Sequence, residues 1–173
     1  MKKKNKNRGH LIWITGLSGS GKTSLANAIK PRIQKKYGNT LVINGDDLRK
    51  IFNLNKYDKN SRLNYGRQYC KFLKFLTDQN VNVIFTVVGL FNELRKWNKK
   101  NIKNYVEVFV KANISKIKKK KRKKIYFNNK SNFIVGLQIK PEFPKKPNII
   151  INNDFSKSLK KLSDILFKKI IQN

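Results

Sequence analysis

The chain has 173 residues, and its 41 Lys and Arg against 9 Asp and Glu give a formal charge of +32 at neutral pH. This length predicts one domain over residues 1–173, because it is too short for two ordinary domains. One cysteine excludes an internal disulfide, and one histidine argues against multi-histidine metal sites and most hydrolase triads.

The chain starts with a basic tail at residues 1–9, followed by a predicted strand, LIWIT, at 11–15. The strand is almost wholly apolar, which is typical of strands covered on both faces. This start imitates a signal peptide, but the apolar run is too short and would contain Lys22. No other segment has the roughly 18 uncharged apolar residues that span a membrane. We therefore expect a cytoplasmic protein without a membrane partner.

The stretch GLSGSGKT lies between this strand and a predicted helix, and it fits the phosphate-loop pattern G-x-x-x-x-G-K-[ST] at every position. Glycine lets backbone N–H groups approach phosphate oxygens, and the following helix N-terminus favours an anion. In this pattern Lys22 reaches the β- and γ-phosphates and Thr23 binds Mg²⁺. A glycine turn without a ligand is the alternative. We expect ATP to be bound by Gly16, Leu17, Ser18, Gly19, Ser20, Gly21, Lys22 and Thr23.

Asp46 and Asp47 are the only adjacent carboxylates, and they directly follow the second predicted strand, LVIN, at 41–44. Ligands bind at the carboxyl ends of parallel strands. A kinase needs a carboxylate there to hold metal or to orient the attacking hydroxyl. Capping of the next helix is an alternative role that is compatible with metal binding. We expect the first and second strands to be neighbours in the sheet, so that the acid lies within reach of the phosphate loop.

The remaining predicted elements continue the alternation of strand and helix. They are a helix at 62–79, strands at 81–88, 105–110 and 148–151, and a helix at 156–170. Such alternation is typical of an α/β fold with a parallel sheet covered by helices. We predict a P-loop NTPase-like three-layer sandwich with a central parallel five-stranded sheet.

The stretches WITGLSGSGKTSLA and INGDDLRKIF resemble the adenylyl-sulfate (APS) kinase family, and the similarity extends over about residues 9–154. Members of this family phosphorylate the 3′-hydroxyl of adenylyl sulfate with MgATP. The resemblance implies catalytic roles for Lys22 and Asp46, with Thr23 and Asp46 as metal ligands. Asn44 stands where the family has the first acid of its D-G-D-x-x-R stretch.

The same resemblance implies a binding site for the acceptor nucleotide. The family positions that hold it fall on Arg49, Phe52, Arg62, Arg67 and Phe133. Phe133 or its neighbour Ile134 takes the place of an aromatic that stacks on the acceptor base. Gly89 stands where the family has a serine described as a phosphorylated intermediate, so that role cannot operate in this chain.

A basic run, KIKKKKRKK at 116–124, lies in the expected lid region, about residues 112–140. The family's lid motif aligns with KKRKKIY at 120–126, so the resemblance implies that Arg122 and Lys123 belong to a lid over the nucleotide. A solvated basic helix is the alternative.

These features predict an ATP-dependent kinase with MgATP as phosphate donor and a small nucleotide as acceptor. The resemblance implies adenylyl sulfate as that acceptor, a place in sulfate assimilation, and a homodimer, since APS kinases commonly dimerise. The segment from Gly89 to Val110 and the tail after the lid look closer to a divergent branch found among surface-polysaccharide genes. At least one such branch phosphorylates a CDP-linked phosphoramidate, which is the alternative acceptor.

Two other classes of function remain open at this stage. The charge of +32 favours a nucleic-acid-binding protein or a polynucleotide-end kinase, although the basic residues are spread along the whole chain and locate no binding surface, so nucleic acid is the less favoured partner. The altered lid and Asn44 are compatible with a nucleotide-binding protein that has lost catalysis.

Overall fold

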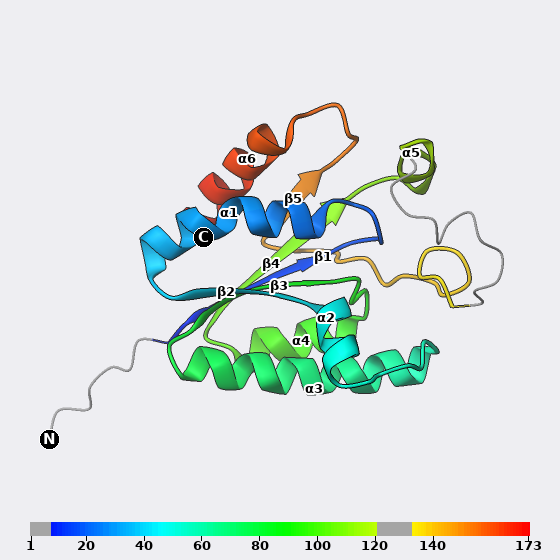
Figure 1. Cartoon of the computed structure of the whole chain (residues 1–173), viewed down its shortest axis with the longest axis horizontal. Coiled ribbons are helices and arrows are strands. Elements are labelled where there is room, and N and C mark those ends of the chain that lie inside the picture. The colour runs from blue at the N-terminus through cyan, green and yellow to red at the C-terminus, as the bar shows by residue number, and fades with distance from the viewer. Residues whose placement is uncertain (1–7, 121–132) are drawn as a thin grey trace, which may run out of the picture.

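The computed structural model describes residues 8–120 and 133–173, so Arg122 and Lys123 lie outside the described residues (Figure 1). The described strands form one parallel sheet in the order β2-β3-β1-β4-β5. The strands are β1 (His10–Thr15), β2 (Thr40–Asn44), β3 (Asn82–Val87), β4 (Asn104–Lys111) and β5 (Ile149–Asn152). The predicted α/β sandwich with a five-stranded parallel sheet is confirmed.

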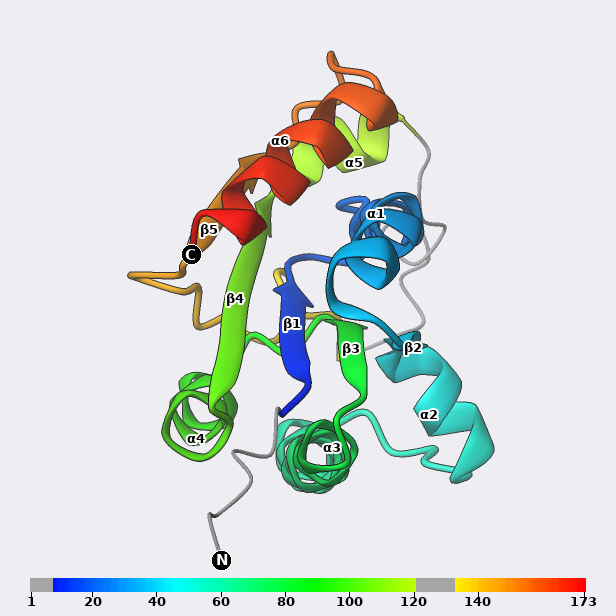
Figure 2. The same cartoon turned by 90° about the vertical axis from the view of Figure 1, so that its left-hand side faces the viewer.

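Helices cover both faces of the sheet, as Figure 2 shows. The described helices are α1 (Lys22–Tyr37), α2 (Gly45–Ile51), α3 (Lys59–Asp78), α4 (Asn92–Asn101), α5 (Ile114–Lys119) and α6 (Leu159–Ile171). One apolar core joins α1 and α6 to the sheet, and a second joins α3 and α4 to its other face. None of the described helices is long and apolar enough to cross a bilayer.

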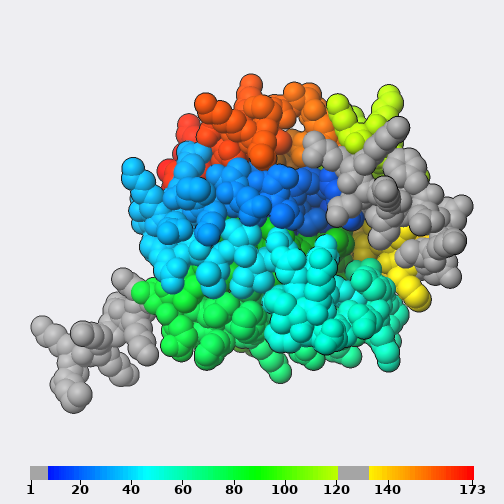
Figure 3. Space-filling model, viewed as in Figure 1, coloured from blue at the N-terminus to red at the C-terminus, as the bar shows by residue number. Residues whose placement is uncertain are grey.

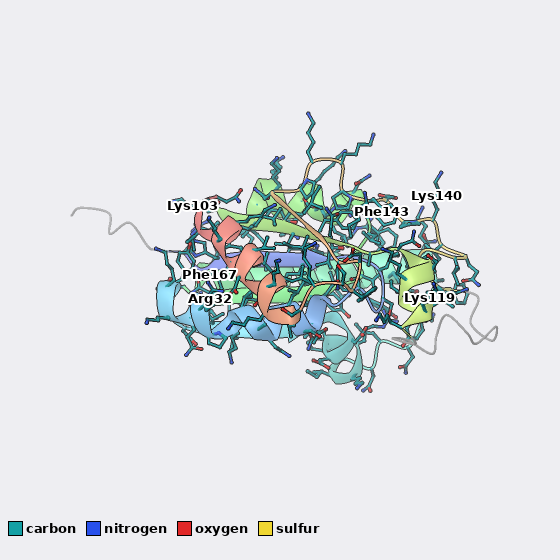
Figure 4. All side chains as sticks on the ribbon, turned by 90° about the horizontal axis from the view of Figure 1, so that it is seen from above. Arg32, Lys103, Lys119, Lys140, Phe143 and Phe167 are labelled. Atoms are coloured by element: carbon teal, nitrogen blue, oxygen red, sulfur yellow. The ribbon has the colours of Figure 1, made fainter. Side chains whose placement is uncertain are left out.

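Exposed side chains also connect α1 directly to α6. The Arg32 guanidinium of α1 lies 4.0 Å from the centre of the Phe167 ring of α6, and the two side chains lie together in Figure 4. Arg32 also pairs with Asp164 at 2.6 Å. On the molecular face seen in Figure 3, α6 lies above α1, and α2 lies below it.

The expectation that β1 and β2 are neighbours was wrong, because β3 lies between them. Crossovers between parallel strands are right-handed. Since α1 and α3 cover opposite faces, the right-handed crossover through α3 runs along the sheet in the direction opposite to the crossover through α1. It therefore places β3 between β1 and β2. In the register, Thr15 of β1 pairs with Val87, and Asn44 of β2 pairs with Thr86. The carboxyl ends of the three strands are therefore level.

At the amino ends of the strands, the buried side chain of Asn82 connects the starts of β1, β2 and β3. Its Oδ1 accepts a hydrogen bond from the His10 backbone N–H at 3.0 Å. Its Nδ2 donates to the carbonyl oxygens of Tyr37 and Asn39, at 2.9 and 3.0 Å. One amide thus pairs with the His10 N–H and the Tyr37 carbonyl, and it adds a second hydrogen bond to the Asn39 carbonyl, which also accepts from the Asn82 backbone N–H.

We expect Asn82→Ala to lower the free energy of unfolding by about 2–3 kcal/mol, because it leaves buried backbone groups without partners. Equilibrium urea unfolding measures the change. Asn39→Ala is the matched control, since it removes an exposed amide and keeps the Asn39 carbonyl; it should change stability by less than about 0.5 kcal/mol. Equal stabilities for the two variants would contradict this role of Asn82.

Candidate active site

The loop between β1 and α1 adopts backbone conformations that require glycine. Gly19 and Gly21 have φ of 77° and 97°, in the left-handed region. A Cβ on Gly16 would lie 2.5 Å from the carbonyl oxygen of Val110, so any side chain there would collide with β4. The loop therefore places its backbone close to the end of the sheet, and α1 starts directly after Gly21.

A cavity of about 350 Å³, here called the donor cavity, lies between this loop and the strand ends. The loop and α1 contribute Ser18, Gly19, Gly21, Lys22, Thr23 and Ser24. The ends of β2 and β3 contribute Asn44, Thr86, Val87 and Val88, and the first turn of α2 contributes Asp46. Gly16, Leu17 and Ser20 do not line it; Leu17 and Ser20 are buried. Lys22 is also buried, and its Nζ donates to the carbonyl oxygen of Leu17 at 2.8 Å.

Asn44 makes two hydrogen bonds at the end of β2. Its Oδ1 accepts from the Thr86 hydroxyl at 2.6 Å, and its Nδ2 donates to Asp47 Oδ2 at 2.7 Å. An ionised acid at this position would accept from Thr86 but would have no proton to donate to Asp47. The amide thus holds Asp47 beside β2, and it is Asp46 that lines the donor cavity.

A second cavity of about 420 Å³, here called the acceptor cavity, adjoins the first. Asp46, Ser18 and Val88 line both cavities. The remaining lining residues are Arg49, Lys50, Leu54, Asn55, Tyr57, Arg62, Ile134 and Val135. Asp46, in the first turn of α2, therefore lies where the two cavities meet.

Two predicted substrate-binding arginines, Arg49 and Arg62, lie together in the acceptor cavity. The Arg49 and Arg62 guanidinium carbons lie 4.1 and 5.3 Å from the centre of the Tyr57 ring. Arg49 donates to the Lys56 carbonyl at 2.5 Å, and Arg62 donates to the carbonyls of Tyr57 and Phe133 at 2.6 and 3.0 Å.

This pair of arginines leaves the cavity with excess positive charge. Burial and then the nearby Arg49 charge lower the pKa of Arg62 from its ordinary value. Within the described residues, no carboxylate forms an ion pair with Arg49 or Arg62. Such a site attracts an anion, and planar guanidinium groups suit phosphate or sulfate oxygens.

Arg67 and Phe52, which were also expected to bind the substrate, do not line either of these cavities. Arg67 pairs with Glu93 at 2.6 Å at a separate depression, and this pairing raises the Arg67 pKa and lowers the Glu93 pKa. Phe52 is 53% exposed at the end of α2. Phe133 is also exposed, at 44%, and its carbonyl accepts a hydrogen bond from Arg62, whereas its neighbour Ile134 lines the acceptor cavity.

Two residues of the site were missed by sequence analysis. Tyr57 lies between the two arginines, and Asn153, just after β5, donates from Nδ2 to the Ser20 carbonyl of the phosphate loop at 2.9 Å. Nothing in the local sequence pattern identifies either residue. A Cβ on Gly21 would lie 2.9 Å from Asn153 Nδ2, so the amide and the loop are in close contact.

The chain is similar to known proteins in sequence and in fold. The family model described as adenylylsulphate kinase matches residues 8–152. A cytidine diphosphoramidate kinase of Campylobacter jejuni is 33% identical over an alignment of 168 residues that covers 95% of this chain and 98% of that protein. An adenylyl-sulfate kinase of Buchnera aphidicola is 29% identical over 179 residues, covering 97% and 83%. The solved APS kinase of Mycobacterium tuberculosis, in complex with AMPPNP and APS, matches with a TM-score of 0.83 at 22% identity, covering 96% and 99%.

Lys22→Ala is expected to weaken binding of a non-hydrolysable ATP analogue roughly tenfold to a hundredfold, because it removes the charged ammonium group that would bind phosphate oxygens in the donor cavity. Isothermal titration calorimetry measures the dissociation constant. Lys35→Ala is the control, because Lys35 is an exposed lysine in the last turn of the same helix. If both variants bind the analogue as the unaltered protein does, the loop is not the donor site.

Proposed function

The chain belongs to the adenylylsulphate kinase family, and from this premise we propose that it transfers the γ-phosphoryl group of ATP to a hydroxyl of a small nucleotide conjugate. The family model covers the phosphate loop and both strand ends that line the donor cavity. The observation that carries the proposal is the position of Asp46, which lines the donor and the acceptor cavities at once. A hydroxyl bound in one cavity can then approach a phosphate held in the other.

On the donor side, the backbone N–H groups of the loop and Lys22 hold the phosphates of ATP. Lys22 would exchange its hydrogen bond to Leu17 for phosphate oxygens. Phosphoryl transfer depends mainly on alignment and on neutralising charge, so these groups supply most of what the donor requires.

The residues present also fit a magnesium ion. Thr23 and Asp46 line the same cavity and offer a hydroxyl and a carboxylate oxygen, the ligand type that Mg²⁺ prefers. In residues 8–120 and 133–173, no group of three or more His, Cys, Asp or Glu could hold a metal ion. Mg²⁺ usually binds through one or two protein oxygens together with substrate phosphates. When bound, it would neutralise charge on the transferred group.

On the acceptor side, Asp46 orients the attacking hydroxyl and accepts its proton as the hydroxyl oxygen bonds to the γ-phosphorus, the bond from that phosphorus to the β–γ bridging oxygen breaks, and ADP leaves. Arg49 and Arg62 bind the anionic part of the acceptor, and the larger acceptor cavity takes its nucleoside. Tyr57 keeps the two arginines in place through its ring and its carbonyl.

For the acceptor we propose cytidine diphosphoramidate, with adenylyl sulfate as the second candidate. The Campylobacter jejuni enzyme named for the former shares 33% identity with nearly full coverage of both chains. The Buchnera aphidicola adenylyl-sulfate kinase shares 29%, and 83% of its length is covered. Asn44, which lines the donor cavity, and Gly89 also depart from the residues expected of adenylyl-sulfate kinases.

Asp46→Asn is expected to reduce turnover of the true acceptor by about two or more orders of magnitude while leaving ATP binding intact, since the carboxylate acts on the reacting hydroxyl. ADP release measures turnover with cytidine diphosphoramidate, adenylyl sulfate, nucleoside monophosphates and an oligonucleotide. Asp47→Asn is the matched control, because Asp47 is the adjacent carboxylate and lines neither cavity. Its turnover should remain within a few-fold of the unaltered protein.

Each outcome of this assay decides between the functions considered. Turnover of one small conjugate, lost in Asp46→Asn and kept in Asp47→Asn, supports the proposal and identifies the acceptor. Turnover of the oligonucleotide alone would instead favour a polynucleotide-end kinase. ATP binding without turnover of any acceptor would indicate a nucleotide-binding protein without catalysis, and the proposal would be wrong.

A further inference from the structure

The phosphate loop is held from outside by the residue that follows β5. The buried side chain of Asn153 donates from Nδ2 to the Ser20 carbonyl at 2.9 Å. A Cβ on Gly21 would lie 2.9 Å from the same nitrogen, so the amide packs directly against the peptide that joins Ser20 to Gly21. Gly21 lines the donor cavity, whereas Asn153 does not. The contact therefore acts on the loop from behind the cavity.

The geometry of a peptide bond determines what this contact does to the loop. A trans peptide is planar, so its carbonyl and its N–H point in opposite directions. The Ser20–Gly21 peptide is trans, and its carbonyl points to Asn153, so the Gly21 N–H points away from Asn153. Among the described residues, no backbone carbonyl accepts a hydrogen bond from this N–H. Since Gly21 directly precedes α1, its N–H belongs to the groups at a helix N-terminus that bind anions.

Two further hydrogen bonds fix the orientation of the asparagine. Its Oδ1 accepts from the Phe155 backbone N–H at 3.1 Å, so its Nδ2 is the atom that faces Ser20. Its own backbone N–H donates to the Lys111 carbonyl at 2.9 Å, which extends the pairing of β4 with β5 by one residue. Asn153 is only 8% exposed. The position of the amide is therefore set by the sheet and its neighbours and does not depend on the loop.

The start of the loop also rests on this side of the sheet. A Cβ on Gly16 would lie 2.5 Å from the Val110 carbonyl of β4. The loop is thus supported by the end of β4 at Gly16 and by the residue after β5 at Ser20. Neither strand contributes a residue to the lining of the donor cavity. Both strands act on the cavity only through the loop.

Asparagine suits this position because its side chain supplies a donor and an acceptor without a charge. An ionised aspartate would accept from the Phe155 N–H but would have no proton to donate to the Ser20 carbonyl. It would also place a negative charge behind a site for phosphates. A leucine has a similar size but makes neither hydrogen bond. The amide is therefore the group that both holds the carbonyl and tolerates an anion nearby.

We propose that Asn153 is a positioning residue for the phosphate donor: by binding the Ser20 carbonyl, it aims the Gly21 N–H at the phosphates in the donor cavity. Asn153 does not itself touch the nucleotide. Without this hydrogen bond, fixing the peptide would become part of the cost of binding the phosphates. The inference rests on the proposed function, since it concerns the donor of that same reaction. It extends the donor site to a residue 133 positions away from Ser20.

Isothermal titration calorimetry with ADP tests this role. Asn153→Leu keeps the size of the side chain, removes the donor, and should weaken ADP binding roughly tenfold. Asn152→Leu is the matched control, because Asn152 is the neighbouring exposed amide at the end of β5. Its affinity for ADP should stay within about twofold of the unaltered protein. A merely structural role would lower the fraction of protein that binds, which calorimetry reports as the stoichiometry, and would leave the dissociation constant unchanged.

Nuclear magnetic resonance of the assigned Gly21 amide provides a second measurement, which the unaltered protein alone can supply. ADP should shift this amide proton downfield, because the proton enters a hydrogen bond to a charged oxygen. In Asn153→Leu the shift at saturating ADP should be smaller. If the Gly21 amide does not respond to ADP, or if Asn153→Leu binds ADP as tightly as Asn152→Leu does, Asn153 does not position the donor site.

Neither measurement needs an acceptor, so failure of this inference can be told apart from failure of the proposed function. Loss of ADP affinity in Asn153→Leu supports the role of Asn153 even where no acceptor is phosphorylated, a result that would overturn the kinase proposal alone. Unchanged ADP affinity in Asn153→Leu, together with turnover of an acceptor by the unaltered protein, would overturn this inference alone. If the unaltered protein does not bind ADP, both are wrong.

Discussion

The common direction of the strands is the constraint on which the site depends. Parallel strands present all their carboxyl ends at one edge, and the register makes the ends of β1, β2 and β3 level. The phosphate loop follows the first of these strands and α2 follows the second. Because β3 lies between β1 and β2, residues 86–88 at its end line the donor cavity between the phosphate loop and α2. The distance between loop and acid is thus set by the backbone of the sheet.

The few acids of this basic chain are distributed so that the site keeps its positive charge. Glu93 is paired with Arg67, and Asp47 is held by Asn44. The carboxylate of Asp46 faces the cavities instead, beside arginines that have no acid partner within residues 8–120 and 133–173. A surplus of +32 spread along the chain attracts any polyanion without selectivity, whereas two unneutralised guanidinium groups in a cavity favour a small anion.

Much of the fold and half of the site could be predicted from local sequence. The phosphate loop is recognisable because its glycines and Lys22 act within eight consecutive residues, and Asp46 because it follows a strand directly. The order of the strands was harder, since it depends on which face each helix covers. Residues that reach the site from elsewhere in the chain, such as Tyr57 and Asn153, carry no local pattern.

Helix geometry explains why only one of the two arginines of α3 that were expected to bind substrate lines the acceptor cavity. Arg62 and Arg67 are five residues apart, which separates them by about 140° around a helix. When Arg62 faces the acceptor cavity, Arg67 must face elsewhere, and it meets Glu93. The same rule places Tyr65 and Tyr69 on the face of Arg62.

The contact between Asn153 and the phosphate loop has a consequence for the order in which this protein matures. The Ser20 carbonyl and the amide that binds it are 133 positions apart in the chain. During synthesis the loop leaves the ribosome early, but the residue that secures it emerges only after β5. The phosphate loop therefore gains this hydrogen bond only after β5 has been synthesised.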